Sequence, residues 1–143
     1  YLSEGMAQFE SRLKHYSHFE TIVVPAIKGG GRRKAEVLKK LEFEAFRKHF
    51  QPGDWMVLLD EKGKSYTSRG FDQQMQKWMN AGPKRLVFIV GGAFGFSPKM
   101  YEKANGLLSM SEMTTSHQLI RVVFLEQIYR ALTILNNEPY HND

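Results

Sequence analysis

Two short segments have the composition of ligand-binding turns: residues 91–95 (GGAFG) and residues 111–116 (SEMTTS). Glycine lacks a Cβ, so a ligand can touch the peptide plane at the first, and the hydroxyl groups of the second can hydrogen-bond a polar ligand. The same patterns are typical of a tight strand-to-helix turn and of a helix N-cap at Thr115 or Ser116. Neither segment forms a dinucleotide fingerprint or a P-loop, so the pattern alone identifies no ligand.

A basic, glycine-rich loop is the next candidate. Lys28 precedes three glycines, and Arg32, Arg33 and Lys34 follow them. Clustered positive charge can hold the phosphates of an RNA backbone, because binding releases counterions from the nucleic acid. A solvated loop that keeps the protein soluble explains the same residues equally well.

The histidines offer acid–base chemistry rather than a metal site. There are five, at 15, 18, 49, 117 and 141. His15 and His18 are three residues apart, but no third ligand lies near them, so we expect no metal. His117 stands at the start of a helical pattern and His141 in the tail after Pro139. There is no cysteine and no G-x-S-x-G segment, which argues against thiolate sites and the common hydrolase nucleophiles.

Composition indicates an ordinary globular protein. The chain has 143 residues, a net charge of +5, 42% hydrophobic residues and 24% charged residues. This length predicts one domain, residues 1–143. No apolar run is long enough to cross a membrane, and the lack of cysteine suits a reducing compartment, so we expect a cytoplasmic protein without a signal peptide. The charge permits an anionic partner such as nucleic acid.

Hydrophobic periodicity predicts alternating helices and strands. Helical spacing occupies 1–16, 34–50, a stretch from 71 to about 82, and 117–135, and Ser97-Pro98 looks like the start of a further helix. Strands are predicted at 18–27, 55–60, 85–90 and 106–110. Apolar strands separated by helices indicate an α/β fold with a mostly parallel sheet flanked by helices.

The order of these elements suggests where a site would lie. Open parallel sheets bind ligands at the carboxyl ends of their strands. Leu59-Asp60, residues 91–95 and residues 111–116 all belong to that edge. The helix over 117–135 is apolar on more than one side, so it is either a central core helix or partly covered by a second subunit.

Taken in order, the motifs resemble the RlmH family, SPOUT-class methyltransferases that use S-adenosylmethionine to modify a pseudouridine of large-subunit ribosomal RNA. The residues that carry the resemblance are LVFIVGG at 86–92, LLSMSEMT at 107–114, HQ at 117–118, RVV at 121–123, EQIYRA at 126–131 and PYH at 139–141. The resemblance covers nearly the whole chain. Members of the family normally begin with a short strand ahead of the position of Tyr1.

The resemblance implies a C-terminal trefoil knot that holds the cofactor, and a homodimer. Carried over by position, the cofactor-binding residues are Leu59, Gly92, Ser111, Glu112, Met113, Thr114, Thr115 and Ser116. The chain departs from the family at Thr115-Ser116, where a bulkier residue and a proline often precede the histidine. This difference could change the adenine pocket but would leave backbone contacts in place.

The reaction that the resemblance implies is methylation of N-3 of a pseudouridine. A base must then remove the ring proton, and a donor or cation must stabilise the anionic ring. The candidates are His141, His117, Tyr140, Arg121 and Arg130. The partner would be ribosomal RNA or the assembled ribosome. A non-catalytic RNA- or ribosome-binding protein is the alternative interpretation, and a small-molecule α/β enzyme ranks last.

Overall fold

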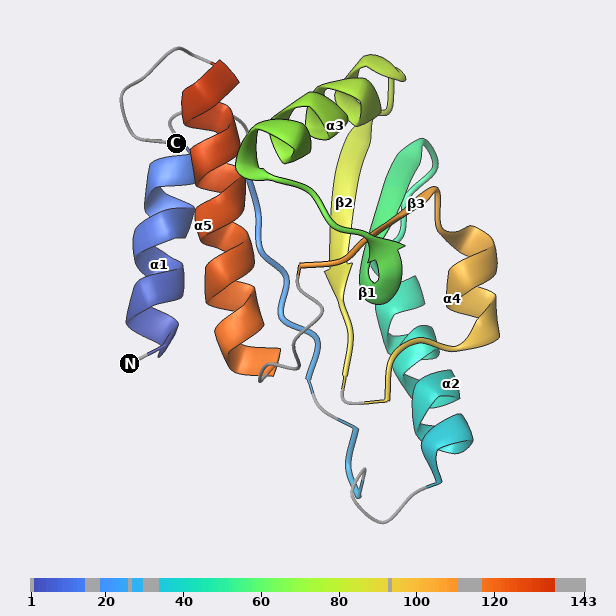
Figure 1. Ribbon diagram of the computed structural model, residues 1–143. Helices are drawn as coiled ribbons and strands as arrows, with labels where there is room; N and C mark the ends of the chain where they lie inside the picture. Colours follow the sequence, from blue (N-terminus) through green and yellow to red (C-terminus); the bar gives the residue numbers. More distant parts are fainter. Residues whose placement is uncertain are drawn as a thin grey trace.

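The computed structural model describes residues 2–14, 19–25, 27–29, 34–92, 94–110 and 117–135 (Figure 1). Its helices are α1 (Leu2–Leu13), α2 (Ala35–Arg47), α3 (Ser68–Asn80), α4 (Pro98–Lys103) and α5 (His117–Leu135). Its strands are β1 (Asp54–Lys64), β2 (Arg85–Val90) and β3 (Gly106–Leu108). Among the described residues, no helix is long and apolar enough to span a membrane.

The sheet is parallel, as predicted. Its order is β2-β1-β3, and β1 pairs in parallel with both neighbours. Leu59 lies opposite Val90 on one side and Leu108 on the other. The carboxyl ends of all three strands therefore meet at one edge.

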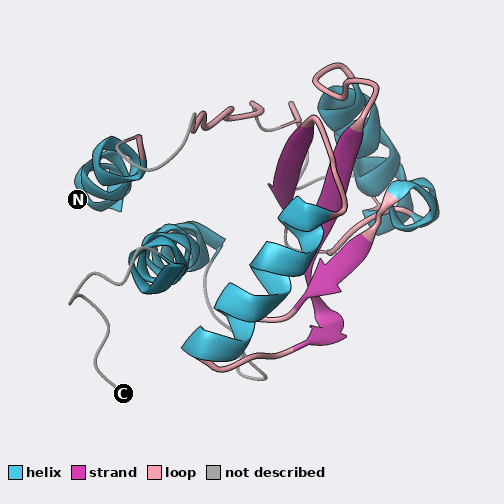
Figure 2. Ribbon diagram, turned by 90° about the horizontal axis from the view of Figure 1, so that it is seen from above, coloured by secondary structure: helices cyan, strands magenta, loops and turns pink. Residues whose placement is uncertain are grey.

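Helices cover both faces of this sheet (Figure 2). Successive residues of a strand point to opposite faces. Met56 and Leu58 accordingly pack with Phe43 of α2 and Met100 of α4. Their neighbours Val57 and Leu59 belong to the larger core, which contains residues of α1, α3 and α5. The fold is thus a three-layer α/β arrangement.

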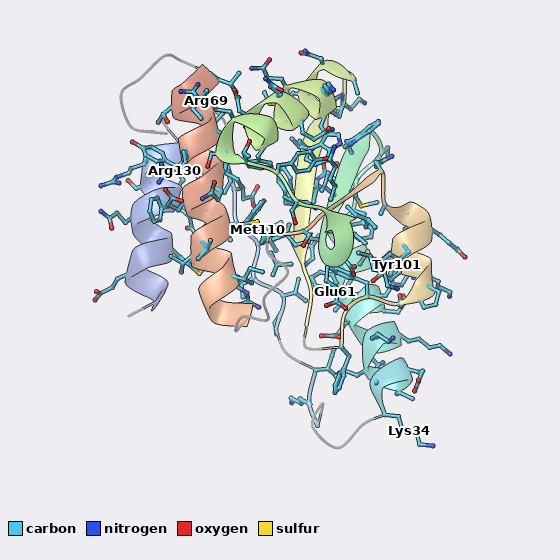
Figure 3. The ribbon with its side chains drawn as sticks, in the orientation of Figure 1. Lys34, Glu61, Arg69, Tyr101, Met110 and Arg130 are labelled. Carbon is cyan, nitrogen blue, oxygen red and sulfur yellow. The ribbon has the colours of Figure 1, made fainter. Side chains whose placement is uncertain are left out.

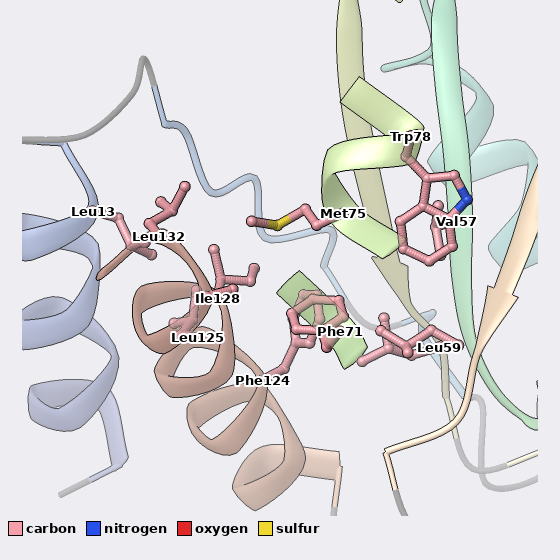
Figure 4. Packing of buried hydrophobic residues seen from close by; sticks show 12 residues of the cluster. Leu13, Val57, Leu59, Phe71, Met75, Trp78, Phe124, Leu125, Ile128 and Leu132 are labelled. Atoms are coloured by element: carbon pink, nitrogen blue, oxygen red, sulfur yellow. The ribbon is translucent and has the colours of Figure 1, made fainter. Parts of the chain in front are cut away.

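Aromatic residues pack among aliphatic side chains in the larger core (Figure 4). The ring of Phe88 in β2 lies 4.9 Å from Phe124 of α5 and 6.0 Å from Trp78 of α3, both edge-on. Such pairs favour tilted geometry because the ring edge is electropositive and the face electronegative. These contacts fix α3 and α5 against the same face of the sheet.

The apolar circumference of α5 is covered by two helices of the same chain. On one side α1 packs against it, with Leu13 fully buried and the rings of Phe9 and Tyr129 6.1 Å apart. On another side lies α3, through Phe71 and Phe124. A central core helix therefore explains most of the pattern, and the second subunit stays a prediction.

The strand predicted at 18–27 is wrong for the residues described there, since 19–25 and 27 form none. A strand needs a neighbour for its backbone hydrogen bonds, and none of the three described strands pairs with this segment. Ile22 and Val23 are 44% and 69% exposed. The β-branched residues suited the segment to a strand, but pairing decides whether one forms.

Two boundaries also differ from prediction. β1 continues four residues beyond Asp60 because Lys64 pairs with Leu108 after an irregularity in the ladder. α3 begins at Ser68 because the Thr67 hydroxyl accepts a hydrogen bond from the Gly70 amide at 3.0 Å and caps the helix. The predicted Ser97 cap is confirmed, with its hydroxyl accepting from the Met100 amide.

Candidate functional site

The edge at which a ligand site is predicted is formed by parts of the three parallel strands. Leu59 is central and 9% exposed, Gly92 follows β2 by two residues, and Ser109 and Met110 follow β3. Residues 111–116, which would complete the edge, lie outside the described residues. The described part therefore contains residues of the first two predicted segments and ends at Met110, just before the third.

The turn after β2 is tight and depends on its glycines. The Gly95 amide donates to the Gly92 carbonyl oxygen at 3.2 Å, and Gly95 has a φ of +79°. A Cβ on Gly92 would come within 2.6 Å of a Glu42 carboxylate oxygen. A Cβ on Gly91 would come within 2.8 Å of the Phe96 ring. Packing alone thus requires glycine here, because the Phe96 ring and the Glu42 carboxylate occupy the space that a side chain would take.

The part of β1 that follows Leu59 is tied to α4. Tyr101 donates a short hydrogen bond from its hydroxyl to Asp60, and the other carboxylate oxygen of Asp60 accepts from the Lys62 amide at 2.8 Å. The Lys62 ammonium lies 5.0 Å from the centre of the Tyr101 ring. Burial raises the pKa of Tyr101 to about 12, helped by the hydrogen bond to Asp60 and the negative charges of Asp60 and Glu61. The phenol is therefore a neutral donor at physiological pH. Figure 3 shows Tyr101 and Glu61 where β1 meets α4.

Two distant parts of the chain, β1 and β3, come into close contact at Gly63. A Cβ on this glycine would lie 2.6 Å from the Leu108 nitrogen and 2.7 Å from the Leu107 carbonyl carbon. One residue later, the Lys64 carbonyl oxygen accepts from the Ser109 amide at 3.1 Å. The last residues of β1 consequently pack directly against the backbone of β3, with no room for a side chain between them.

A pocket of about 280 Å³ opens beside the end of β3. Its described lining comes from the start of α3, the end of β3 and one side of α5, namely Tyr66, Thr67, Ser68, Phe71, Leu108, Ser109, Met110, Val123 and Gln127. Ser68 donates from its hydroxyl to the Gln127 side-chain oxygen at 3.2 Å and joins α3 to α5 across the pocket. The lining combines aromatic and aliphatic surface with a few polar groups, as small-molecule sites do.

The two candidate arginines occupy different surroundings on α5. Arg130 forms an ion pair with Glu126, which also accepts a hydrogen bond from the Gln127 amide nitrogen at 3.0 Å. Arg121 lies nine residues earlier, about two and a half turns away and on the opposite side of the helix. Within one subunit the structure therefore does not bring the two arginines together. Arg130 can be found on α5 in Figure 3.

Several predicted site residues cannot be compared with the structure. Tyr140, His141, Arg32 and Arg33 lie outside the described residues, and His117 is described only as the first residue of α5. Lys28 and Lys34, at the two ends of the basic loop, are both exposed. No cluster of three or more metal-ligating side chains occurs in the described part of the chain.

The pocket was missed from the sequence, where residues 61–70 look like an unremarkable polar connection. The usable signal was Thr67-Ser68 next to Phe71, a helix cap that places hydroxyl groups beside an aromatic ring. Its other wall comes from α5, almost sixty residues further along the chain, and no local pattern links the two.

The chain belongs to a family described as predicted SPOUT methyltransferases, which matches residues 1–141. It is similar to proteins named ribosomal RNA large subunit methyltransferase H. The protein from Parabacteroides distasonis is 50% identical over all of this chain and 91% of its own length. That from Cytophaga hutchinsonii is 45% identical over 99% of this chain and 91% of its own length. The resemblance to this family seen in the sequence is thereby confirmed.

Proposed function

We propose that this protein methylates large-subunit ribosomal RNA at N-3 of a pseudouridine, with S-adenosylmethionine as methyl donor. The observation that carries the proposal is the common edge formed by Leu59, the Gly92 turn and the end of β3. In addition, the chain is 50% identical to a protein named ribosomal RNA large subunit methyltransferase H. A ribosomal substrate would make the protein cytoplasmic.

The described residues fit the proposed cofactor. The donor is a nucleoside joined to an amino acid, and it needs a surface of backbone groups with small residues beside it. The Gly92 turn offers small residues and backbone groups, and it is held in shape by the Gly95 amide, the Phe96 ring and the Glu42 carboxylate. We assign Leu59, Gly92 and residues 111–116 to hold it. When bound, this cofactor supplies a methyl group on a positively charged sulfur that is already activated for transfer.

We also infer that the C-terminal half is knotted. The close packing of Gly63, near the end of β1, against Leu107 and Leu108 supports this, because it holds the chain that leaves β3 tightly against the last residues of β1. Knots are rare in proteins. A knot would hold the cofactor-binding turns in a fixed relation.

The chemistry left to the protein is orientation and removal of a proton. We assign His141 or His117 to take the proton from the ring nitrogen and Tyr140 to stack on the base or hydrogen-bond to it. Arg130 lies on the helix three residues from Gln127 of the pocket, so it would face the anionic ring or a phosphate there. Arg121 would then contact phosphate elsewhere, as would Lys28, Arg32, Arg33 and Lys34.

The pocket beside Met110 is the place we propose for the target base. Met110 lines it and directly precedes the segment assigned to the cofactor. A base in this pocket would lie against Phe71 and Tyr66 and reach the Gln127 amide. Proximity of a base pocket to the methyl donor is what a transfer reaction requires.

The separation of Arg121 and Arg130 on α5 is the reason to propose a homodimer. Arg121 and Arg130 cannot serve one site within a subunit, but two subunits could each present one. Val123, exposed beside the pocket, is surface that a second copy could cover. Sedimentation equilibrium at micromolar concentration should give twice the chain mass, and a monomer there would contradict this part.

Transfer of tritium from labelled S-adenosylmethionine to ribosomes tests the function. Ribosomes from cells lacking the enzyme should accept label on one pseudouridine, and His141→Ala should lose transfer while it still binds cofactor by calorimetry. Absence of transfer to such ribosomes by the unaltered protein, with cofactor binding intact, would favour a non-catalytic binding protein. No heat with the cofactor or its demethylated product would exclude the methyltransferase.

A further inference from the structure

A hydrogen-bonded clamp joins two of the strand-end turns on the face opposite the pocket. Asp60 is the first residue after Leu59, and it accepts from the Tyr101 hydroxyl of α4. Its second oxygen accepts from the Lys62 amide, which fixes the backbone of β1 just after Leu59. The carboxylate thereby ties this part of β1 both to itself and to α4.

Tyr101 is in turn fixed against the second turn. Its ring packs edge-on against Phe96, with ring centres 6.1 Å apart. Phe96 lies so close to Gly91 that no side chain fits between them. A continuous set of contacts therefore runs from Asp60 through Tyr101 and Phe96 to the glycine turn after β2.

None of these side chains belongs to the residues assigned to hold cofactor or substrate. Asp60 and Tyr101 lie on the side of the sheet covered by α2 and α4, whereas the pocket lies on the side of α3 and α5. Lys62 adds a cation over the Tyr101 ring at 5.0 Å, which restrains the ring further. The proposed chemistry therefore assigns no role to this set of contacts.

We propose that Asp60 and Tyr101 are positioning residues for the methyl donor, which set the spacing between Leu59 in β1 and the Gly92 turn. The inference rests on the proposed function, since it concerns the same cofactor site. Backbone contacts to a ligand lose strength when their donors and acceptors shift by a fraction of an ångström. Loss of the clamp should thus weaken cofactor binding without removing any group that touches it.

Tyr101→Phe is the main test, because it removes one hydroxyl and keeps the ring between Phe96 and Lys62. We expect the Kd for S-adenosylhomocysteine, measured by calorimetry, to rise about tenfold, as for loss of one hydrogen bond to a charged group. KM for the cofactor should rise similarly while KM for ribosomes stays within twofold. Asp60→Ala should have the same effect, and the double variant should be no worse than Asp60→Ala, since both remove one shared bond.

Asp54→Asn is the matched control. Asp54 is at the opposite end of β1, where it accepts from Arg85 at 2.8 and 2.7 Å, so its loss destabilises the same strand away from the edge. We expect this variant to lower the melting temperature and to leave the cofactor Kd within twofold. A merely structural role for Tyr101 would make the two variants behave alike.

The outcomes separate the two proposals. If the unaltered protein does not bind the cofactor, the proposed function fails. If it binds, but Tyr101→Phe has an unchanged Kd, or Asp54→Asn raises the Kd as much, the positioning role is overturned. Should Tyr101→Phe not fold, Asp60→Ala gives the same comparison.

Discussion

Gly63 touches Leu108 backbone to backbone, with room for a hydrogen but not for a methyl group. Gly63→Ala would force β1 and β3 apart at this point. It should destabilise the protein by about 1–3 kcal/mol, the usual cost of overpacking a tight site. Urea unfolding followed by far-UV circular dichroism measures this.

Gly5→Ala is the control for that experiment. Gly5 lies in α1, and an added Cβ would meet only Val122 at 3.4 Å, an ordinary contact. Alanine favours a helix over glycine by up to about 1 kcal/mol, so this variant should be as stable as the unaltered chain or more so. Equal stability of Gly63→Ala and the unaltered protein would mean that there is more room between Gly63 and Leu108 than the distances indicate.

A bulky residue in the pocket should separate base binding from cofactor binding. Val123 borders the pocket and is 40% exposed, so Val123→Trp can fill the opening without disrupting the core. We expect methyl transfer to fall at least about tenfold, by the loss of alignment between donor and base, with cofactor Kd unchanged. Val37→Trp, at an equally exposed valine of α2, should leave both values as they were. Loss of cofactor binding in Val123→Trp would instead assign the pocket to the cofactor.

The ion pair between Asp54 and Arg85 makes stability depend on pH. Burial raises the pKa of Asp54, but hydrogen bonds from Arg85 and the Gln51 amide and the Arg85 charge outweigh it, so this pKa lies below its ordinary 3.8. A carboxyl group with a lowered pKa stabilises the fold above 3.8 and loses that effect as the pH falls through the folded value.

Asp54→Asn should therefore cost roughly 1.5–3 kcal/mol near neutrality, as for a buried bond to a charged group. The difference from the unaltered protein should stay constant down to about pH 5 and shrink below 3.8. Urea unfolding at several pH values measures it. A difference that grew on acidification would have the wrong sign for this ion pair.

Asp72 should show the opposite dependence. It is 6% exposed in α3, and one of its carboxylate oxygens has no hydrogen-bond partner among the described residues. Burial raises the pKa of Asp72 by more than the Gln76 hydrogen bond and the Arg69 charge lower it. The carboxylate thus costs stability above the ordinary 3.8, and the cost disappears as the group is protonated. Asp72→Asn should be more stable by roughly 1 kcal/mol at pH 7 and equal at pH 3, measured by the same unfolding curves. Lower stability of Asp72→Asn at pH 7 would mean that the Gln76 hydrogen bond and the Arg69 charge outweigh the cost of burial.

The local sequence pattern was sufficient to predict an element wherever the residues of that element alone determine its structure. Arg85–Val90 and His117–Leu135 have their predicted bounds, because an apolar run or a helical repeat reports burial directly. The Ser97 cap follows from one hydroxyl and the proline after it. The ordered motifs between residues 86 and 141 were enough to identify the family.

Pairing between distant segments was decided only by the tertiary structure. The β-branched residues Ile22 and Val23 predict a strand, yet without a hydrogen-bonded neighbour they remain irregular and exposed. Lys64, in a polar stretch, becomes part of β1 because Leu108 lies beside it. Three contacts of the site join residues forty or more positions apart. They are the contact of Gly63 with Leu108, the hydrogen bond between Tyr101 and Asp60, and the hydrogen bond between Ser68 and Gln127 in the pocket wall. Residue types determine what each segment can do, whereas the contacts between segments depend on how the whole chain packs.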